Sequence, residues 1–518
     1  MIYYFCLKKG RIPFGVKVLI SDIKTGNAYA LMKNHIYSTF DLSKSLEHFQ
    51  EKATKFLELT NISEWDGNVF REREKKIREI ALVLAGECTA LLLHNLSQSQ
   101  DFLDKAEQET QGWWQTSTKK HGCKERQILT VGNVAVTLKL PYVVERQTQP
   151  KKNQKSLHEG FCPFLRYLGM SEGLTPGVLS TIARYGAIAG SFEAARTTLI
   201  DWGVNISLKR IERLTYYFGK IGINLRESKI TSLELGNLPT SNTLKDQRVV
   251  IAVDGGRTRI RINKKGRRKA KTNRVGFTGE WIEPKLLTIY VVNEQGEKIR
   301  NGEVSITNDG TYQGYQGFLQ ILEMYLVNLG ISQAKQVLLI ADGAEWIWIH
   351  IPPLLKKLKC PPETYQLLDF FHAASHLQDF ADAAFNTNNE RQQWFQKARK
   401  SLKKGQALDL MRNMGEFIFE ANGERLKILV RERNYILKAY RRRLLKYNSV
   451  ALKKLPLGSG AVESLIRQVV NLRMKGNSKF WLQDNAEIML HLRCQWIAKS
   501  WDNFSDSIFN SFIKPQTC

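Results

Sequence analysis

The sequence predicts an α/β protein whose core is a mixed five-stranded sheet, interrupted by an all-α insertion and preceded by mostly helical domains with one β-hairpin. Three observations predict this class. Short apolar runs ending in an acidic residue recur after residue 247. Amphipathic stretches, with apolar residues three and four positions apart, separate those runs and dominate the N-terminal half. One stretch of alternating apolar and polar residues, 126–146, surrounds a Gly-Asn pair and predicts the hairpin.

Charge narrows the range of partners. Lys and Arg total 77 against 50 Asp and Glu, which gives a net charge of +27 over 518 residues. An excess of this size favours a polyanionic partner, either nucleic acid or an anionic membrane. The longest apolar segment, which begins at Ile80, is broken by Glu87 and is shorter than the roughly 20 residues of a membrane span. We therefore expect double-stranded DNA as the partner and no membrane.

The seven cysteines form no CxxC pair. This spacing is typical of reduced thiols in a cytoplasmic protein, and with a DNA partner we expect the chain at the nucleoid. The N-terminal residues before Met32 are either a first small β element or an over-extended start of the chain.

A chain of this length exceeds one compact core, so several domains are expected. The expected segments are a mostly helical region at 1–118, the β-hairpin and a basic linker at 119–161, a helical DNA-binding domain at 162–246, the first part of the α/β core at 247–370, a helical insertion at 371–456, and the closing helices of the core at 457–518.

Residues 191–219 have the layout of a helix-turn-helix. A first helix ends before Gly203, where glycine favours a turn, and Ser207 is placed to cap the second helix. In such a motif the second helix contacts DNA. The alternative is two packed helices without a DNA role. The candidate DNA contacts on this helix are Lys209, Arg210 and Arg213.

From residue 248 the pattern becomes three strands, a helix, a strand, a helix, a strand and a helix. This is the element order of the ribonuclease H core. The expected strands are 248–256, 257–262 and 285–293, a fourth that ends at Asp342, and a fifth in "TYQLLDFF".

Asp254 and Asp342 end the first and fourth of these strands, which are neighbours in that topology. Two converging carboxylates repel each other unless cations lie between them, so the pair predicts Mg²⁺ or Mn²⁺, with two ions per site. The third acid is either Asp369 or Glu463. Glu463 follows a Gly-Ser-Gly turn that permits close approach of a phosphate, but it also stands four residues before Arg467, with which it can form a surface ion pair.

Four motifs, "VDGGR", "IADGAEWIW", "LLDFFHAASHL" and "LGSGAVESLIRQVVNLRMKG", occur in the order and spacing found in DDE transposases of bacterial insertion sequences. The chain resembles the ISKra group most, over residues 245 to 500. The resemblance implies that Asp254, Asp342 and Glu463 are the catalytic, metal-binding triad, with Asp369 as a secondary candidate. It also implies binding of transposon ends, DNA cleavage, joining of the 3′-OH to target DNA, and action as a homodimer or larger assembly.

Residues 257–274 carry ten basic side chains in eighteen positions. A solvated loop is one interpretation, and a clamp on the DNA backbone beside the acids is the other. The candidate DNA contacts in and after this run are Arg257, Arg259, Lys264, Lys265, Arg267, Arg268, Lys269, Lys271, Arg467, Arg473 and Lys475.

Two rival functions remain at the level of sequence: a domesticated, catalytically inactive DNA-binding protein, and a cellular nuclease with a ribonuclease H fold. His372 and His376 have i,i+4 spacing, but without a nearby third ligand in the sequence a zinc site is disfavoured. Trp346 and Trp348 are interpreted as core residues in preference to base-stacking ones.

Overall fold

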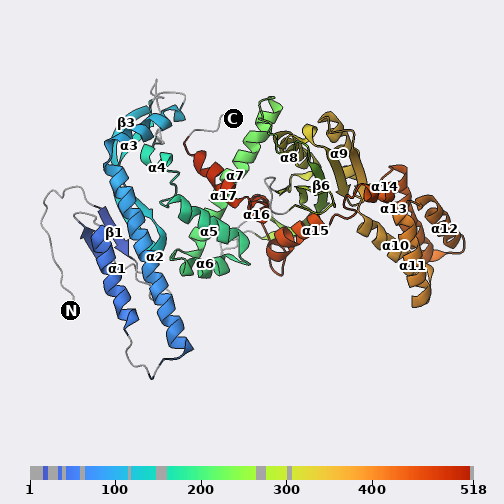
Figure 1. The fold of residues 1–518 in the computed structure, drawn as a ribbon, viewed down its shortest axis with the longest axis horizontal. Helices are drawn as coiled ribbons and strands as arrows, with labels where there is room; N and C mark the ends of the chain where they lie inside the picture. The colour runs from blue at the N-terminus through green and yellow to red at the C-terminus, as the bar shows by residue number, and fades with distance from the viewer. Residues whose placement is uncertain are drawn as a thin grey trace. The chain divides into compact units, whose positions relative to one another are not determined.

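A computed structural model describes residues 16–20, 33–37, 42–58, 63, 65–114, 118–146, 160–263, 276–299 and 306–513. The chain divides into two compact units. The first comprises Met1–Ile221 with Asn503–Thr517, and the second comprises Gly222–Asp502. The boundary falls inside one long helix, α7 (Leu208–Glu234) (Figure 1).

The first unit combines helices with a small antiparallel sheet in the strand order β2-β1-β4-β3, and β5 adds to β4. The strands are β1 (Val16–Ile20), β2 (Lys33–Tyr37), β3 (Thr118–Leu129), β4 (Val134–Glu145) and β5 (Gly160–Phe161). The expected hairpin is present as β3 and β4, with Gly132 and Asn133 at its turn in left-handed conformations at φ 69° and 61°. Because β1 pairs with β4, the structure favours a β element before Met32.

Among the described residues, three α-helices lie between β2 and β3 in the chain, and the second of them packs on β4. They are α1 (Leu42–Leu57), α2 (Gly67–Gln98) and α3 (Gln100–Thr110). By length and composition alone α2 is long and apolar enough to cross a membrane, a test that a core helix also passes. Its Ala90 and Leu93 are buried in one cluster with Val136 and Leu138 of β4, so α2 serves as a packing surface for the hairpin.

The rest of the first unit is helical: α4 (Pro163–Tyr167), α5 (Pro176–Ile188), α6 (Phe192–Asp201), the first half of α7, and most of α17 (Trp501–Asn510). The turn between α6 and α7 contains Gly203 at φ 67°, where a Cβ would lie 2.8 Å from the backbone of Gly132. The Ser207 hydroxyl accepts a hydrogen bond from the Arg210 N–H, as expected of a cap. The turn therefore packs against the tip of the hairpin.

The second unit is built on a mixed five-stranded sheet in the order β10-β9-β6-β11-β12. Its strands are β6 (Arg248–Gly255), β9 (Lys285–Val291), β10 (Thr307–Thr311), β11 (Gln336–Ala341) and β12 (Thr364–Leu368). β6, β11 and β12 run parallel, while β9 pairs antiparallel with both β6 and β10. The expected mixed five-stranded sheet is therefore present.

One strand assignment from the sequence was wrong. The run 257–262, expected as the second strand of the sheet, instead forms β7 (Thr258–Asn263), which pairs with β8 (Phe277–Ile282) in a separate two-stranded sheet. The fifth place in the main sheet is taken by β10. Its sequence TNDGT has low β-propensity, but every residue after Thr307 is buried there.

A buried ionic cluster compensates for the polarity of β10. Arg226 of α7 lies 3.3 Å from Asp309 and 2.7 Å from Glu487, and His491 Nδ1 lies 3.0 Å from Asp309. The Tyr325 hydroxyl donates to Asp309 at 2.9 Å. Burial alone would raise the pKa of Asp309, but His491 and Arg226 outweigh it and hold that pKa below its usual range.

Helices pack on the sheet and connect its strands. α8 (Gly314–Leu329) packs on β9 and β10, α9 (Glu345–Lys357) follows β11, and α15 (Gly460–Ile466) packs on β6 and β9 (Figure 1). α15 continues into a π-helix (Arg467–Met474), which is followed by α16 (Gln483–Ile497).

Between β12 and α15 the chain contains helices and no strand. These are α10 (Phe370–Ala384), α11 (Asn388–Lys403), α12 (Ala407–Phe419), α13 (Gly423–Arg441) and α14 (Tyr447–Leu452). α10 packs against both α11 and α13, and α12 contacts both of these helices. The segment thus forms a small helical bundle whose first helix leaves directly from the sheet (Figure 1).

Candidate active site

Two aspartates meet at the carboxyl edge of the sheet. β6 and β11 are parallel neighbours with Val253 opposite Ala341, so Asp254 and Asp342 are the next residues on adjacent strands. The Asp254 carboxylate accepts a hydrogen bond from the Gly255 N–H at 2.6 Å, and that of Asp342 accepts one from the Ala344 N–H at 2.9 Å. The strand register thus brings together the two acids that the sequence singled out.

The pKa of Asp254 is shifted by burial and by the charged groups near its carboxylate. Burial raises the pKa of Asp254 to about 6, and the negative charges of Asp342 and Glu463 add to this effect. The Gly255 N–H and His372 act in the opposite direction but do not cancel it. A carboxylate with a raised pKa at a convergence of acids is a common mark of a functional site.

Glu463 lies on α15, which packs on β6 and β9. Its carboxylate is half exposed, accepts a hydrogen bond from the Ser459 hydroxyl at 3.3 Å, and lies 3.9 Å from His372 Nε2. Within the described part of the chain, no ion pair joins Glu463 to Arg467, which is exposed. The surface pair that was the alternative interpretation of Glu463 is therefore absent.

Asp369, the other candidate for the third acid, is fully buried and caps α10. One carboxylate oxygen accepts from the His372 N–H at 2.8 Å, and the other accepts from the Ser459 N–H. Asp369 thereby fixes the start of α10 and the turn before α15. These contacts suit a positioning residue better than a metal ligand.

The Gly-Ser-Gly turn has a structural reason that differs from the expected one. A Cβ on Gly458 would lie 2.6 Å from the ring of Phe371, and Ser459 is buried with its N–H directed at Asp369. The turn is thus narrow because it docks against the start of α10. Phosphate access is not needed to explain its glycine.

The backbone around Asp342 is contacted by α9 and by α13 of the helical bundle. The Trp348 indole N–H donates to the Asp342 carbonyl at 2.8 Å, which supports the core interpretation of this tryptophan. A Cβ on Gly343 would lie 2.4 Å from the ring of Tyr435 on α13. Tyr435 was not predicted from the sequence, because no local pattern links it to a residue so distant along the chain.

The basic residues proposed to contact DNA are in different environments. In the first unit, Lys209 is exposed, Arg213 pairs with the Glu172 carboxylate at 2.7 Å, and Arg210 donates to the Glu172 carbonyl at 3.2 Å. Two of the three candidate DNA contacts on this helix, Arg210 and Arg213, are therefore bound to Glu172.

In the second unit, Arg257, Arg467 and Lys475 are exposed. Arg259 lies over the ring of Trp281 at 4.8 Å, whereas Arg473 is buried beneath Trp481 and is not available at the surface. The candidates outside the described residues are Lys264, Lys265, Arg267, Arg268, Lys269 and Lys271.

The donor set suits a hard divalent cation. Asp254, Asp342 and Glu463 offer carboxylate oxygens, the ligands preferred by Mg²⁺ and Mn²⁺. Asp342 and Glu463 have no lysine or arginine partner among the described residues. Burial is the main cause of the raised pKa of Asp254, and the charges of Asp342 and Glu463 add to it, so a cation bound among the three carboxylates would reduce their mutual repulsion.

Comparisons with known proteins add little. No family model matches the chain, and no curated protein does. A solved structure to which it has some similarity is the Drosophila P element transposase strand transfer complex, at 10% identity and a TM-score of 0.22, over 65% of this chain and 83% of that one. A likeness this distant carries no argument, so the functional reasoning rests on the geometry of this chain.

Proposed function

We propose that the chain is a DDE-type transposase that binds transposon ends, cleaves DNA and joins the 3′-OH to target DNA. The proposal is supported by two observations: Asp254 and Asp342 follow directly on the adjacent parallel strands β6 and β11, and the charges of Asp342 and Glu463 add to the burial that raises the pKa of Asp254 to about 6. The strand order β10-β9-β6-β11-β12 supports it, because this is the 3-2-1-4-5 order of ribonuclease H-like cores.

In this proposal Asp254 and Asp342 hold the metal from two fixed strand ends, and Glu463 closes the site from a helix. Two divalent cations, when bound, would activate the attacking water or 3′-hydroxyl and stabilise the leaving oxygen. Asp369 orients both His372 and the turn before Glu463 through their backbone N–H groups. The net charge of +27 supports a DNA partner, held mainly through its phosphates.

The test uses the full chain with Mg²⁺ or Mn²⁺ and a plasmid carrying the DNA that flanks its gene, scored for nicks and joined strands. We expect Asp254→Ala, Asp342→Ala and Glu463→Gln each to reduce strand cleavage by about 10³-fold or more while DNA affinity stays within about threefold. Glu424→Gln, which alters an exposed carboxylate on α13, serves as the control.

Appreciable cleavage by any of the three variants would remove that residue from the metal site. Cleavage without joining would favour the nuclease alternative. DNA binding without any cleavage by the unaltered chain would favour the domesticated, inactive protein.

A further inference from the structure

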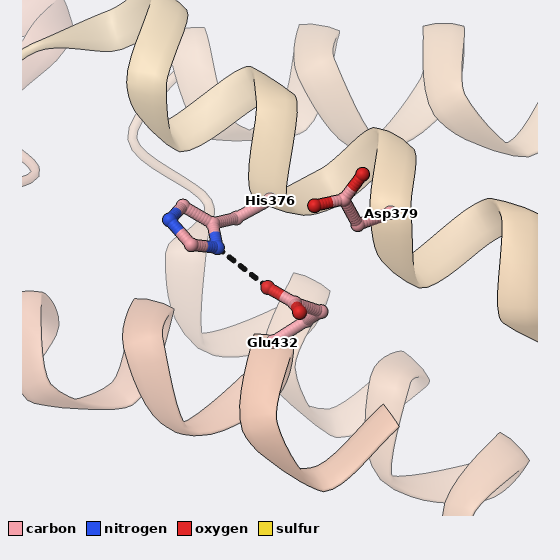
Figure 2. A group of neighbouring side chains, drawn as sticks. All are labelled: His376, Asp379 and Glu432. Atoms are coloured by element: carbon pink, nitrogen blue, oxygen red, sulfur yellow. Dashed lines mark hydrogen bonds and ion pairs between the residues drawn. The ribbon is translucent and has the colours of Figure 1, made fainter. Parts of the chain in front are cut away.

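A second group of metal-ligating side chains lies in the helical bundle, away from the site described above. His376 and Asp379 come from α10, and Glu432 comes from α13. One ligand atom from each lies within 4.8 Å of the other two. Figure 2 shows the imidazole and the Glu432 carboxylate pointing toward one another across the gap between the helices, with Asp379 beside them. The sequence disfavours zinc at His372 and His376, and of these two only His376 belongs to this group.

Two of the three side chains are held in place. His376 Nδ1 lies 2.5 Å from Glu432 Oε2, and the imidazole stacks on Tyr435 with ring centroids 3.5 Å apart. The Glu432 side chain is 1% exposed. A buried carboxylate is costly unless a cation balances it. The arginine that now balances it, Arg431, is 67% exposed and reaches Glu432 from outside the bundle.

The ligand types indicate the class of metal. One imidazole nitrogen with two carboxylates favours a transition-metal ion over Mg²⁺ or Ca²⁺, and three protein ligands with an open fourth position suit Zn²⁺. An acid and a histidine three residues apart on one helix, facing an acid on another, is an arrangement that metal-binding helical bundles use. Asp379 is exposed, so its side chain can close the remaining distance by rotation.

We propose that His376, Asp379 and Glu432 bind one divalent transition-metal ion, with Zn²⁺ as the best fit, and that this ion ties α13 to α10. A simple His376–Glu432 ion pair would explain two of the three residues. It would leave Asp379 an exposed carboxylate that has no hydrogen bond or ion pair within the described part of the chain, although its charge acts on Arg431. Asp379 therefore distinguishes the metal site from the ion pair.

The position of the site gives it a structural consequence. Tyr435 stacks on His376 with one face and abuts Gly343, the residue after Asp342. His372, near Glu463, lies one turn earlier on the same helix as His376. An ion between α10 and α13 would therefore hold Tyr435 against the Asp342 strand end. The proposal does not depend on the reaction assigned to that strand end.

Metal binding is tested by titrating chelator-treated full-length chain with Zn²⁺ in competition with a chromophoric chelator. The chain carries Asp254→Asn and Asp342→Asn, so that the candidate active site does not contribute. We expect one equivalent of Zn²⁺ to bind. Adding Asp379→Asn or His376→Ala should weaken binding at least about tenfold. Asp382→Asn, which removes another exposed carboxylate of α10, is the matched control and should leave the affinity unchanged.

Arg431→Ala provides a test of opposite sign. If Arg431 competes with the ion for Glu432, its removal should tighten Zn²⁺ binding by about threefold to tenfold. Circular dichroism checks that each variant is folded. Asp379 and Arg431 are both exposed, so their substitution should not disturb the packing of the bundle. Absence of Zn²⁺ binding to the parent chain, or an affinity unchanged by Asp379→Asn, would overturn the proposal.

Discussion

Two aspartates of the same sheet, Asp309 on β10 and Asp254 on β6, have opposite electrostatic environments. Asp309 is completely buried, and protein cations face it: Arg226 and His491 lower its pKa despite the burial. Asp254 is partly buried and faces other acids, and its pKa is raised to about 6. The Asp309 cluster balances its own charge. The Asp254 cluster has only His372 as a facing basic group among the described residues, and the divalent cation proposed above would balance the remaining negative charge.

The comparison predicts that the largest effect on stability lies in the balanced cluster. Arg226→Met would leave Asp309 and Glu487 buried without their guanidinium, which typically costs about 3–5 kcal/mol of unfolding free energy. Urea denaturation of the full chain measures this loss. Arg412→Met, which breaks an exposed pair with Asp409, is the control and should change stability little. Equal effects of the two substitutions would contradict the assignment of a structural role to Arg226.

An intermediate effect is expected for Asp369, which is buried but accepts hydrogen bonds from backbone N–H groups. Asp369→Asn keeps one acceptor oxygen for two N–H groups and loses the charge, so we expect a loss of about 1–3 kcal/mol. Strand cleavage should fall as well, because the turn before Glu463 loses its anchor. Denaturation and the plasmid assay measure the two effects. A variant that loses cleavage at unchanged stability would instead make Asp369 a ligand.

The smallest effect concerns the pH dependence of the metal-free protein. The folded pKa of Asp254, about 6, lies above its ordinary value of 3.8, so the folded state binds more protons in this interval. Stability therefore falls as pH rises from about 4 to about 6, by on the order of 1–2 kcal/mol, and stays lower above that range.

Asp254→Asn should remove this loss and be the more stable protein at pH 7 without divalent ions. Thermal unfolding of both proteins at a series of pH values measures the difference, and added Mg²⁺ should reduce it by stabilising the unaltered chain. Parallel pH profiles for the two proteins would show that the repulsion at Asp254 has no effect on stability.

The two strand ends that form the site could be predicted from the sequence, and one strand of the sheet could not. Asp254 and Asp342 follow uninterrupted apolar runs, which are typical of buried parallel strands. β10 has no such run, because its central Asp309 depends on Arg226 and His491, which are far away in the sequence. β7 alternates like a core strand but pairs with β8 instead.

The choice between Asp369 and Glu463 likewise depended on tertiary contacts. Both acids lie beside helix starts, and only the structure reveals that the carboxylate of Asp369 accepts from two backbone N–H groups while Glu463 remains half exposed. No sequence pattern identifies Glu432 as a candidate metal ligand, because its partner His376 is on another helix.

The contact between Gly343 and Tyr435 has a consequence for how such chains can diverge. A methyl group at position 343 would lie 2.4 Å from the tyrosine ring, so position 343 cannot gain a side chain while Tyr435 keeps its place. A relative with alanine or serine at 343 should carry a smaller residue at 435, and the two substitutions should arise as a pair. Position 343 at the sheet edge and position 435 in the helical bundle would then covary among related chains.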